Sequence, residues 1–186
     1  MRKFLITVAL FTSAALVSAG VALPASATTA ACRSGPYTGF CGTMVDHENF
    51  PLAFDSLGQR AASNTPIIGF PNLDGDAGSD FVVLPYGRRL GFMFIFAPNG
   101  EITNMCIANP AGGFGWNPGG PFGLVLRPCN GSVFQRFTRR YVGRNTLVLT
   151  SLADNRIIHS NGEGASLTVV PVPSLLTGND LWSFSH

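Results

Sequence analysis

Short runs of apolar residues, each bounded by glycine, proline, asparagine or aspartate, recur along the whole chain. Examples are FVVLP at 81–85, FMFIF at 92–96, TLVLT at 146–150 and SLTVV at 166–170. Runs of this length and composition are typical of β-strands, and no stretch sustains a helical period. The 22 glycines and 13 prolines supply turns between the runs. The pattern therefore predicts an all-β barrel or sandwich.

A polar residue two positions before an aromatic ring occurs three times. The three motifs are Ser79-Asp80-Phe81, Gln135-Arg136-Phe137 and Asp180-Leu181-Trp182. Each follows an apolar strand that ends in proline, and that strand follows a shorter one that ends at Asp55, Ala108 or His159. The order is the same in all three copies, which predicts a β-trefoil of three repeats of about fifty residues, because so short a unit cannot bury its own apolar face. The three rings, Phe81, Phe137 and Trp182, are predicted to lie in the shared core.

The residues of this pattern resemble the ricin B-type lectins and related carbohydrate-binding trefoil modules, over about residues 40–186. The family pattern is C-L-D, then a strand ending near aromatic-Pro-Cys, then Q-x-W. The second repeat reproduces much of it in Met105-Cys106-Ile107, Leu126-Arg127-Pro128-Cys129 and Gln135-Arg136-Phe137. The resemblance implies a sugar-binding module with a disulfide inside the repeat.

The resemblance implies a sugar site made of a carboxylate, which accepts hydrogen bonds from two hydroxyls, and a ring that stacks on the sugar. In the first repeat, Asp55 and Phe70 occupy these positions, with Ser79 and Asp80 at the turn. We expect an exposed Asp55 and Phe70 to open onto one shallow pocket near Ser79; the alternative is that Asp55 only caps its turn.

The other two repeats lack this pair. The second has Ala108 and Arg127, and the third has His159 and Val170. Binding in either would need different chemistry.

The N-terminus has the features of a signal peptide over residues 1–27: Arg2 and Lys3, an apolar run, and Ala25-Ser26-Ala27 as a cleavage site. We therefore expect a secreted protein with no membrane anchor after cleavage. Without the two leading cations, ten basic residues face ten acidic ones. That balance favours neither nucleic acid nor an anionic membrane as partner.

Four cysteines in an exported chain indicate disulfides. Of the three possible pairings we expect Cys32–Cys41 and Cys106–Cys129. The first would staple a leading loop over residues 28–41 to the first strand, and a trefoil domain follows over residues 42–186. Zinc is the alternative, but the chain has no C-x-x-C spacing. We expect no metal and no cofactor. DGDAGSD at 74–80 resembles a calcium loop but lacks the final acidic ligand.

The segment 109–123 combines glycines and prolines with Phe114, Trp116 and Phe122. We expect these rings to pack back on the barrel; the alternative is an aromatic loop that binds a protein partner. The histidines have no nucleophile motif to join, so no enzyme is expected. The sequence therefore favours a secreted, non-catalytic carbohydrate-binding protein, with a protein-binding trefoil, such as an inhibitor, as the alternative.

Overall fold

The computed structural model describes residues 40–47, 51–71, 77–86, 91–110 and 123–185, and within these ranges the chain is all-β. Its regular elements are strands joined by turns, several of them short 3₁₀ helices. The strands are β1 (Phe40–Asp46), β2 (Leu52–Ser56), β3 (Ile67–Pro71), β4 (Phe81–Pro85), β5 (Phe92–Phe96), β6 (Met105–Ala108), β7 (Val125–Pro128), β8 (Phe137–Tyr141), β9 (Leu147–Ser151), β10 (Ile157–His159), β11 (Thr168–Val170) and β12 (Trp182–Ser185).

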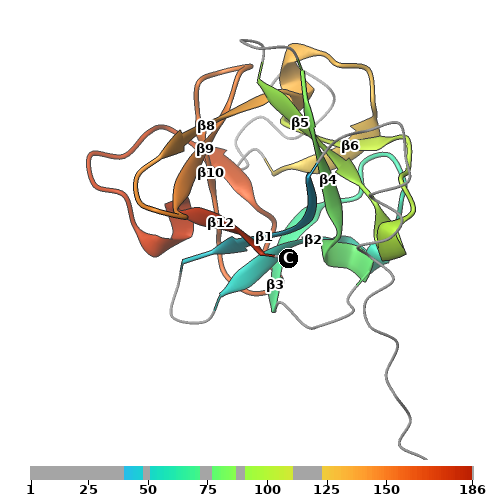
Figure 1. Ribbon diagram of the computed structural model, residues 1–186, viewed down its shortest axis with the longest axis horizontal. Helices are drawn as coiled ribbons and strands as arrows, with labels where there is room; N and C mark the ends of the chain where they lie inside the picture. The colour runs from blue at the N-terminus through green and yellow to red at the C-terminus, as the bar shows by residue number, and fades with distance from the viewer. Residues whose placement is uncertain (1–39, 48–50, 72–76, 87–90, 111–122, 186) are drawn as a thin grey trace, which may run out of the picture.

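Half of these strands pair edge to edge in a closed ring (Figure 1). The ring runs β1–β4–β5–β8–β9–β12 and returns to β1, with every pair antiparallel. Closure leaves no free sheet edge within the ring, which is how small β-proteins satisfy their backbone groups. The predicted all-β class and the barrel are confirmed.

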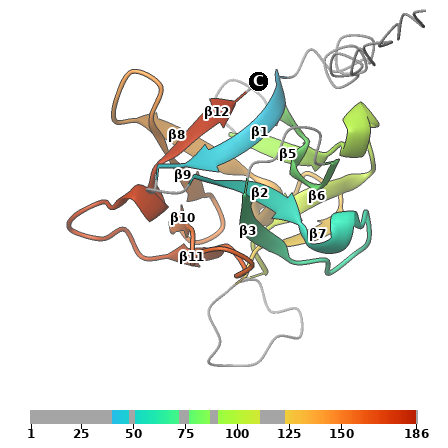
Figure 2. The same cartoon turned by 90° about the horizontal axis from the view of Figure 1, so that it is seen from below.

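The other strands form three hairpins, β2–β3, β6–β7 and β10–β11. Isolated bridges join the hairpins to one another, among them Pro66 with Val125 and Gly123 with Thr168. Figure 2 shows the hairpins on one side of the molecule, below the barrel strands β1, β8 and β12. We call β1–β4 the first unit, β5–β8 the second unit and β9–β12 the third unit.

Each unit ends in a short 3₁₀ turn followed by its last barrel strand. The turns are η2 (Ala77–Ser79), η5 (Val133–Gln135) and η6 (Gly178–Asp180). The next strand begins, after one intervening residue, with Phe81, Phe137 or Trp182.

The three rings lie in one central core, as predicted: Phe81 is 1% exposed, and Phe137 and Trp182 are fully buried. Phe54 links two of them, because its ring contacts Trp182 edge-on at 4.6 Å and Phe81 at 6.4 Å between centroids. Such edge-to-face pairs add to the free energy gained from burying the rings.

A smaller apolar cluster lies on the outer face of β4, β5 and β6. Val82, Ile95 and Cys106 are buried there, and Cys129 packs against them. Cys106 and Cys129 are joined by a disulfide, which confirms this predicted pairing. The disulfide ties the start of β6 to Cys129, the residue that follows β7.

Several predictions concern residues outside the described ranges. They are the signal peptide at 1–27, the leading loop with Cys32, the start of the calcium-like segment at 74–76, and the loop with Phe114, Trp116 and Phe122. The Cys32–Cys41 pairing therefore stays a prediction.

Candidate functional site

The strand register places three residues at equivalent points of the three hairpins. Asp55 lies opposite Ile68, Ala108 opposite Val125, and His159 opposite Thr168. Phe70, Arg127 and Val170 are likewise equivalent, each two residues further along the returning strand. The local chemistry of the three units can therefore be compared position by position.

In the first unit, Asp55 is buried, with 4% of its surface exposed. Its Oδ2 accepts a hydrogen bond from Ser79 Oγ at 3.0 Å, and Gly78 passes so close that an added Cβ would lie 2.5 Å from the same oxygen. The expectation of an exposed Asp55 is wrong, because turn η2 packs against the end of β2.

The other residues predicted for the first-unit site lie around this pair. Phe70 is half-buried and pairs with Ala53, so strand alternation puts it on the same face of the hairpin as Asp55. Asp80 is half-buried and its carbonyl accepts from Ala97 N at 2.9 Å. The structure thus joins Asp55 directly to Ser79 and keeps Phe70 on the same face.

The third unit has a similar contact with different residues. Asp180 is buried in turn η6, and its Oδ1 lies 2.8 Å from His159 Nδ1. Its Oδ2 accepts from the backbone N and the hydroxyl of Thr177, which completes a capping box. In the first and third units, therefore, two polar side chains meet between the hairpin and the turn.

The second unit lacks that contact, because Ala108 has no side chain beyond Cβ. Gln135, equivalent to Ser79 and Asp180, bonds to its own loop instead: its Nε2 donates to Pro128 O at 2.8 Å, and its Oε1 accepts from Asn130 N at 2.8 Å and Gly131 N at 3.2 Å. The space filled by a polar pair in the other units is left open.

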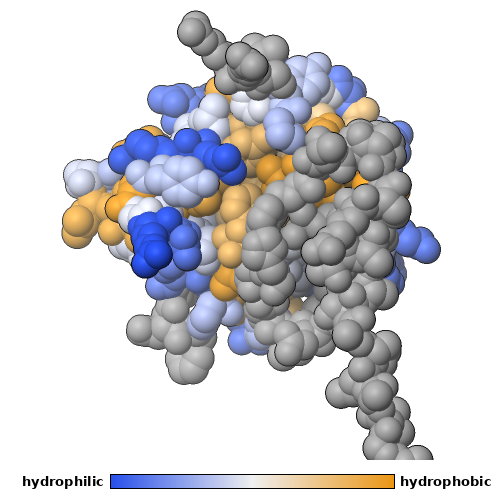
Figure 3. Space-filling view, in the orientation of Figure 1, coloured by the Kyte–Doolittle hydropathy of each residue, from blue (hydrophilic) through white to orange (hydrophobic). Residues whose placement is uncertain are grey.

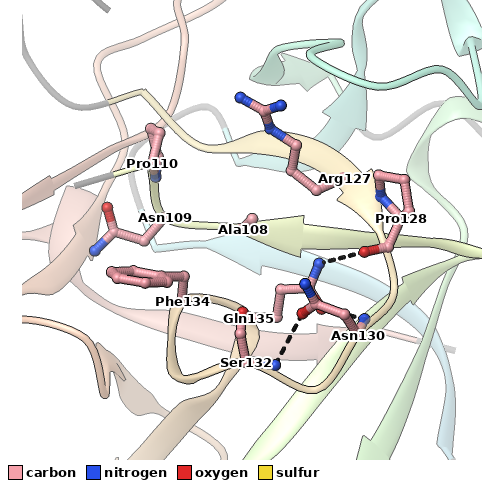
Figure 4. Close-up of a pocket in the computed structure, with 9 residues that line it drawn as sticks. All are labelled: Ala108, Asn109, Pro110, Arg127, Pro128, Asn130, Ser132, Phe134 and Gln135. Atoms are coloured by element: carbon pink, nitrogen blue, oxygen red, sulfur yellow. Dashed lines mark hydrogen bonds between the residues drawn. The ribbon is translucent and has the colours of Figure 1, made fainter. Parts of the chain in front are cut away.

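That space is a pocket of about 280 Å³ between the β6–β7 hairpin and turn η5. Figure 4 shows Ala108 in its middle, with Arg127 on one side and Phe134 and Gln135 on the other. The described lining residues are Ala108, Asn109, Pro110, Arg127, Pro128, Asn130, Ser132, Phe134 and Gln135.

The walls of the pocket are tied together by hydrogen bonds. Asn109 N donates to Phe134 O at 2.8 Å, which fixes the turn against the end of β6. Asn109 itself is buried, and its Nδ2 donates to Ser151 Oγ at 2.9 Å. The pocket is consequently built on restrained backbone, with one aromatic ring, one guanidinium and three side-chain amides in its lining.

The sequence did not predict a sugar site in the second unit, because the second repeat lacks the expected carboxylate and ring. Two signals could have pointed to it. Ala108 is the smallest of the three equivalent residues, and Phe134 places a ring directly before Gln135, where the other units have Gly78 and Asn179.

The described residues contain no cluster of three or more potential metal-ligating side chains. Within the same part of the chain, no helix has the length and apolar character that crossing a membrane requires.

No family model and no curated protein matches this sequence. Solved structures do match its fold. A designed 3-fold symmetric protein, ThreeFoil, has a TM-score of 0.64 at 11% identity, over 78% of this chain and 98% of its own.

Two further matches come from carbohydrate-related proteins. The hemolytic lectin CEL-III has a TM-score of 0.55 at 14% identity, over 78% of this chain and 32% of its own. A non-toxic homologue of type II RIPs from Momordica charantia, in complex with α-methyl-D-galactoside, has a TM-score of 0.56 at 9% identity, over 79% of this chain and 48% of its own. The chain thus spans less than half of each of these two proteins and shares their lectin-like fold.

Proposed function

We propose that this chain is a secreted, non-catalytic β-trefoil of three repeats that binds carbohydrate through the pocket of the second unit. The observation that carries the site is the pocket itself. It opens where Ala108 replaces the polar side chains of the other units, and it has a ring and three side-chain amides in its lining.

The three-repeat trefoil is supported by the strand pairings. Each unit runs from a barrel strand through a hairpin and a 3₁₀ turn to a second barrel strand. The likeness to a designed 3-fold symmetric protein over nearly its whole length supports the same conclusion.

Sugar binding is supported by the chemistry of the lining. A sugar presents an apolar C–H face and a set of hydroxyls, so its site needs a ring and polar groups placed around it. Phe134 supplies the ring, and Asn130, whose side chain is exposed, supplies an amide. The lectin-like fold, shared with a lectin and with a protein solved as a galactoside complex, favours this class of ligand.

The position in the first unit is the competing site for the same function. There the carboxylate of Asp55 already accepts a hydrogen bond from the hydroxyl of Ser79. A sugar would have to share that carboxylate with a protein donor. We therefore place the ligand in the second unit, and a variant of the first unit serves as the control.

A glycan array probed with the purified protein would identify a ligand, and titration of matched variants would locate its site. Phe134→Ala should weaken binding about tenfold or more, by analogy with the stacking of bases on aromatic side chains, which contributes about 1–3 kcal/mol per base. Phe70→Ala removes an equally sized, half-buried ring from the first unit and should leave the affinity unchanged.

Loss of binding in Phe70→Ala with full binding in Phe134→Ala would move the site to Asp55 and Phe70. An array without a reproducible hit, from a protein that captures a defined protein partner, would contradict carbohydrate binding altogether.

A further inference from the structure

The second-unit pocket differs in charge from the equivalent positions of the other two units. The first unit has the carboxylate of Asp55 there, and the third has the carboxylate of Asp180 next to His159. The described lining of the second-unit pocket contains no carboxylate and one cation, Arg127. The charged group that borders this pocket is therefore a hydrogen-bond donor, the guanidinium of Arg127, where the other two units have an acceptor.

The sequence around the pocket also has a net positive charge. Between Glu101 and Asp154 the chain contains no acidic residue and five arginines: Arg127, Arg136, Arg139, Arg140 and Arg144. Arg139 and Arg140 are exposed on β8, and Figure 3 shows strongly hydrophilic surface over β8 and β9. A concave site within such a cationic segment raises the local concentration of anions.

The position of Arg127 at the pocket allows it to bind a carboxylate. It pairs with Cys106 across the β6–β7 hairpin, and its half-buried side chain borders the same pocket as Phe134. A guanidinium has five N–H donors in a planar fork, so it can bind both oxygens of a carboxylate and still keep a contact within the protein.

We propose that the ligand of this pocket is an acidic sugar, a hexuronate unit of a glycan. Its carboxylate binds the Arg127 guanidinium and its C–H face lies on Phe134. The exposed amide of Asn130 forms hydrogen bonds to its hydroxyls. This inference rests on the proposed function and adds the ligand class to it.

The test compares each acid with an uncharged ligand of the same shape. D-galacturonate and D-glucuronate are titrated against the whole protein, alongside their methyl esters and the neutral sugars galactose and glucose, with binding followed by NMR. We expect at least one acid to bind about tenfold or more tightly than its ester, because esterification removes the charge from a charge-assisted hydrogen-bonded pair. Added salt should reduce that preference.

Variants then assign the preference to one residue. Arg127→Ala should abolish it, and Arg127→Lys should keep only part of it, because an ammonium group lacks the fork. Arg140→Ala removes the same charge from an exposed position on β8, outside the pocket lining, and should keep most of the preference. Circular dichroism melting shows that each variant is folded.

Three results would overturn the inference alone. Equal affinity for an acid and its ester, or a preference that survives Arg127→Ala, would do so while leaving the proposed function intact. Binding of neutral glycans with no binding of either acid would have the same consequence. Absence of binding to every glycan, acidic or neutral, would instead remove the proposed function, and this inference with it.

Discussion

Replacing Trp182 tests the central core directly. The side chain is fully buried, its ring contacts Phe54 edge-on at 4.6 Å, and its Nε1 donates to Ile158 O at 3.1 Å. Trp182→Ala therefore removes a large ring, an aromatic contact and the donor for a buried carbonyl at once. Buried Trp→Ala changes cost about 3–5 kcal/mol, and the unpaired carbonyl puts this one at the upper end. A domain of this size is stable by about 5–15 kcal/mol in total, so the loss would be large.

Trp182→Phe is the matched control, because it keeps a ring near Phe54 and removes mainly the N–H group. We expect it to cost about 1–2 kcal/mol, the effect of leaving one buried acceptor without its donor. Urea denaturation followed by far-UV circular dichroism measures both variants, with an unchanged m-value as the check that only stability has changed. A loss below about 1 kcal/mol for Trp182→Ala, or equal losses for the two variants, would refute the placement of this ring in the core.

Three further predictions concern contacts outside that core. Asp55→Ala should lower the free energy of unfolding by about 1–3 kcal/mol, because Ser79 loses its buried acceptor; an unchanged thermal midpoint would contradict this. Gly78→Ala should destabilise the wild type through a clash with Asp55 and do so much less in the Asp55→Ala background, and additive effects in a double-mutant cycle would argue against that contact. Replacing Cys106 and Cys129 by serine should cost about 3 kcal/mol by the chain-entropy estimate, and thiol titration of the unfolded, unreduced wild type should find no free thiol.

The fold could be predicted from the sequence because the residues that recur in each repeat are ones that the core buries. Phe81, Phe137 and Trp182 follow their turns at the same spacing, since each fills the same kind of place in the shared core. The correspondence of Phe70, Arg127 and Val170 could also be deduced, because the prolines that follow them mark the ends of equivalent strands.

The site could not be predicted in the same way. Asp55 has the residue type expected of an exposed ligand, but whether it faces solvent or Ser79 depends on how η2 packs against β2. The second-unit pocket arises from a missing side chain at Ala108 and from the hydrogen bonds of Gln135 to its own loop. A pattern of residue types in the sequence shows neither an open pocket nor the direction in which the Gln135 side chain points.

The most direct test of carbohydrate binding at the second-unit pocket is to map where a glycan from the array binds, by amide NMR of the isotopically labelled protein. We expect saturable shifts at Ala108, Asn109, Phe134 and Gln135, which line the second-unit pocket. Shifts centred instead on Asp55 and Phe70, or no saturable shift with any glycan, would contradict it.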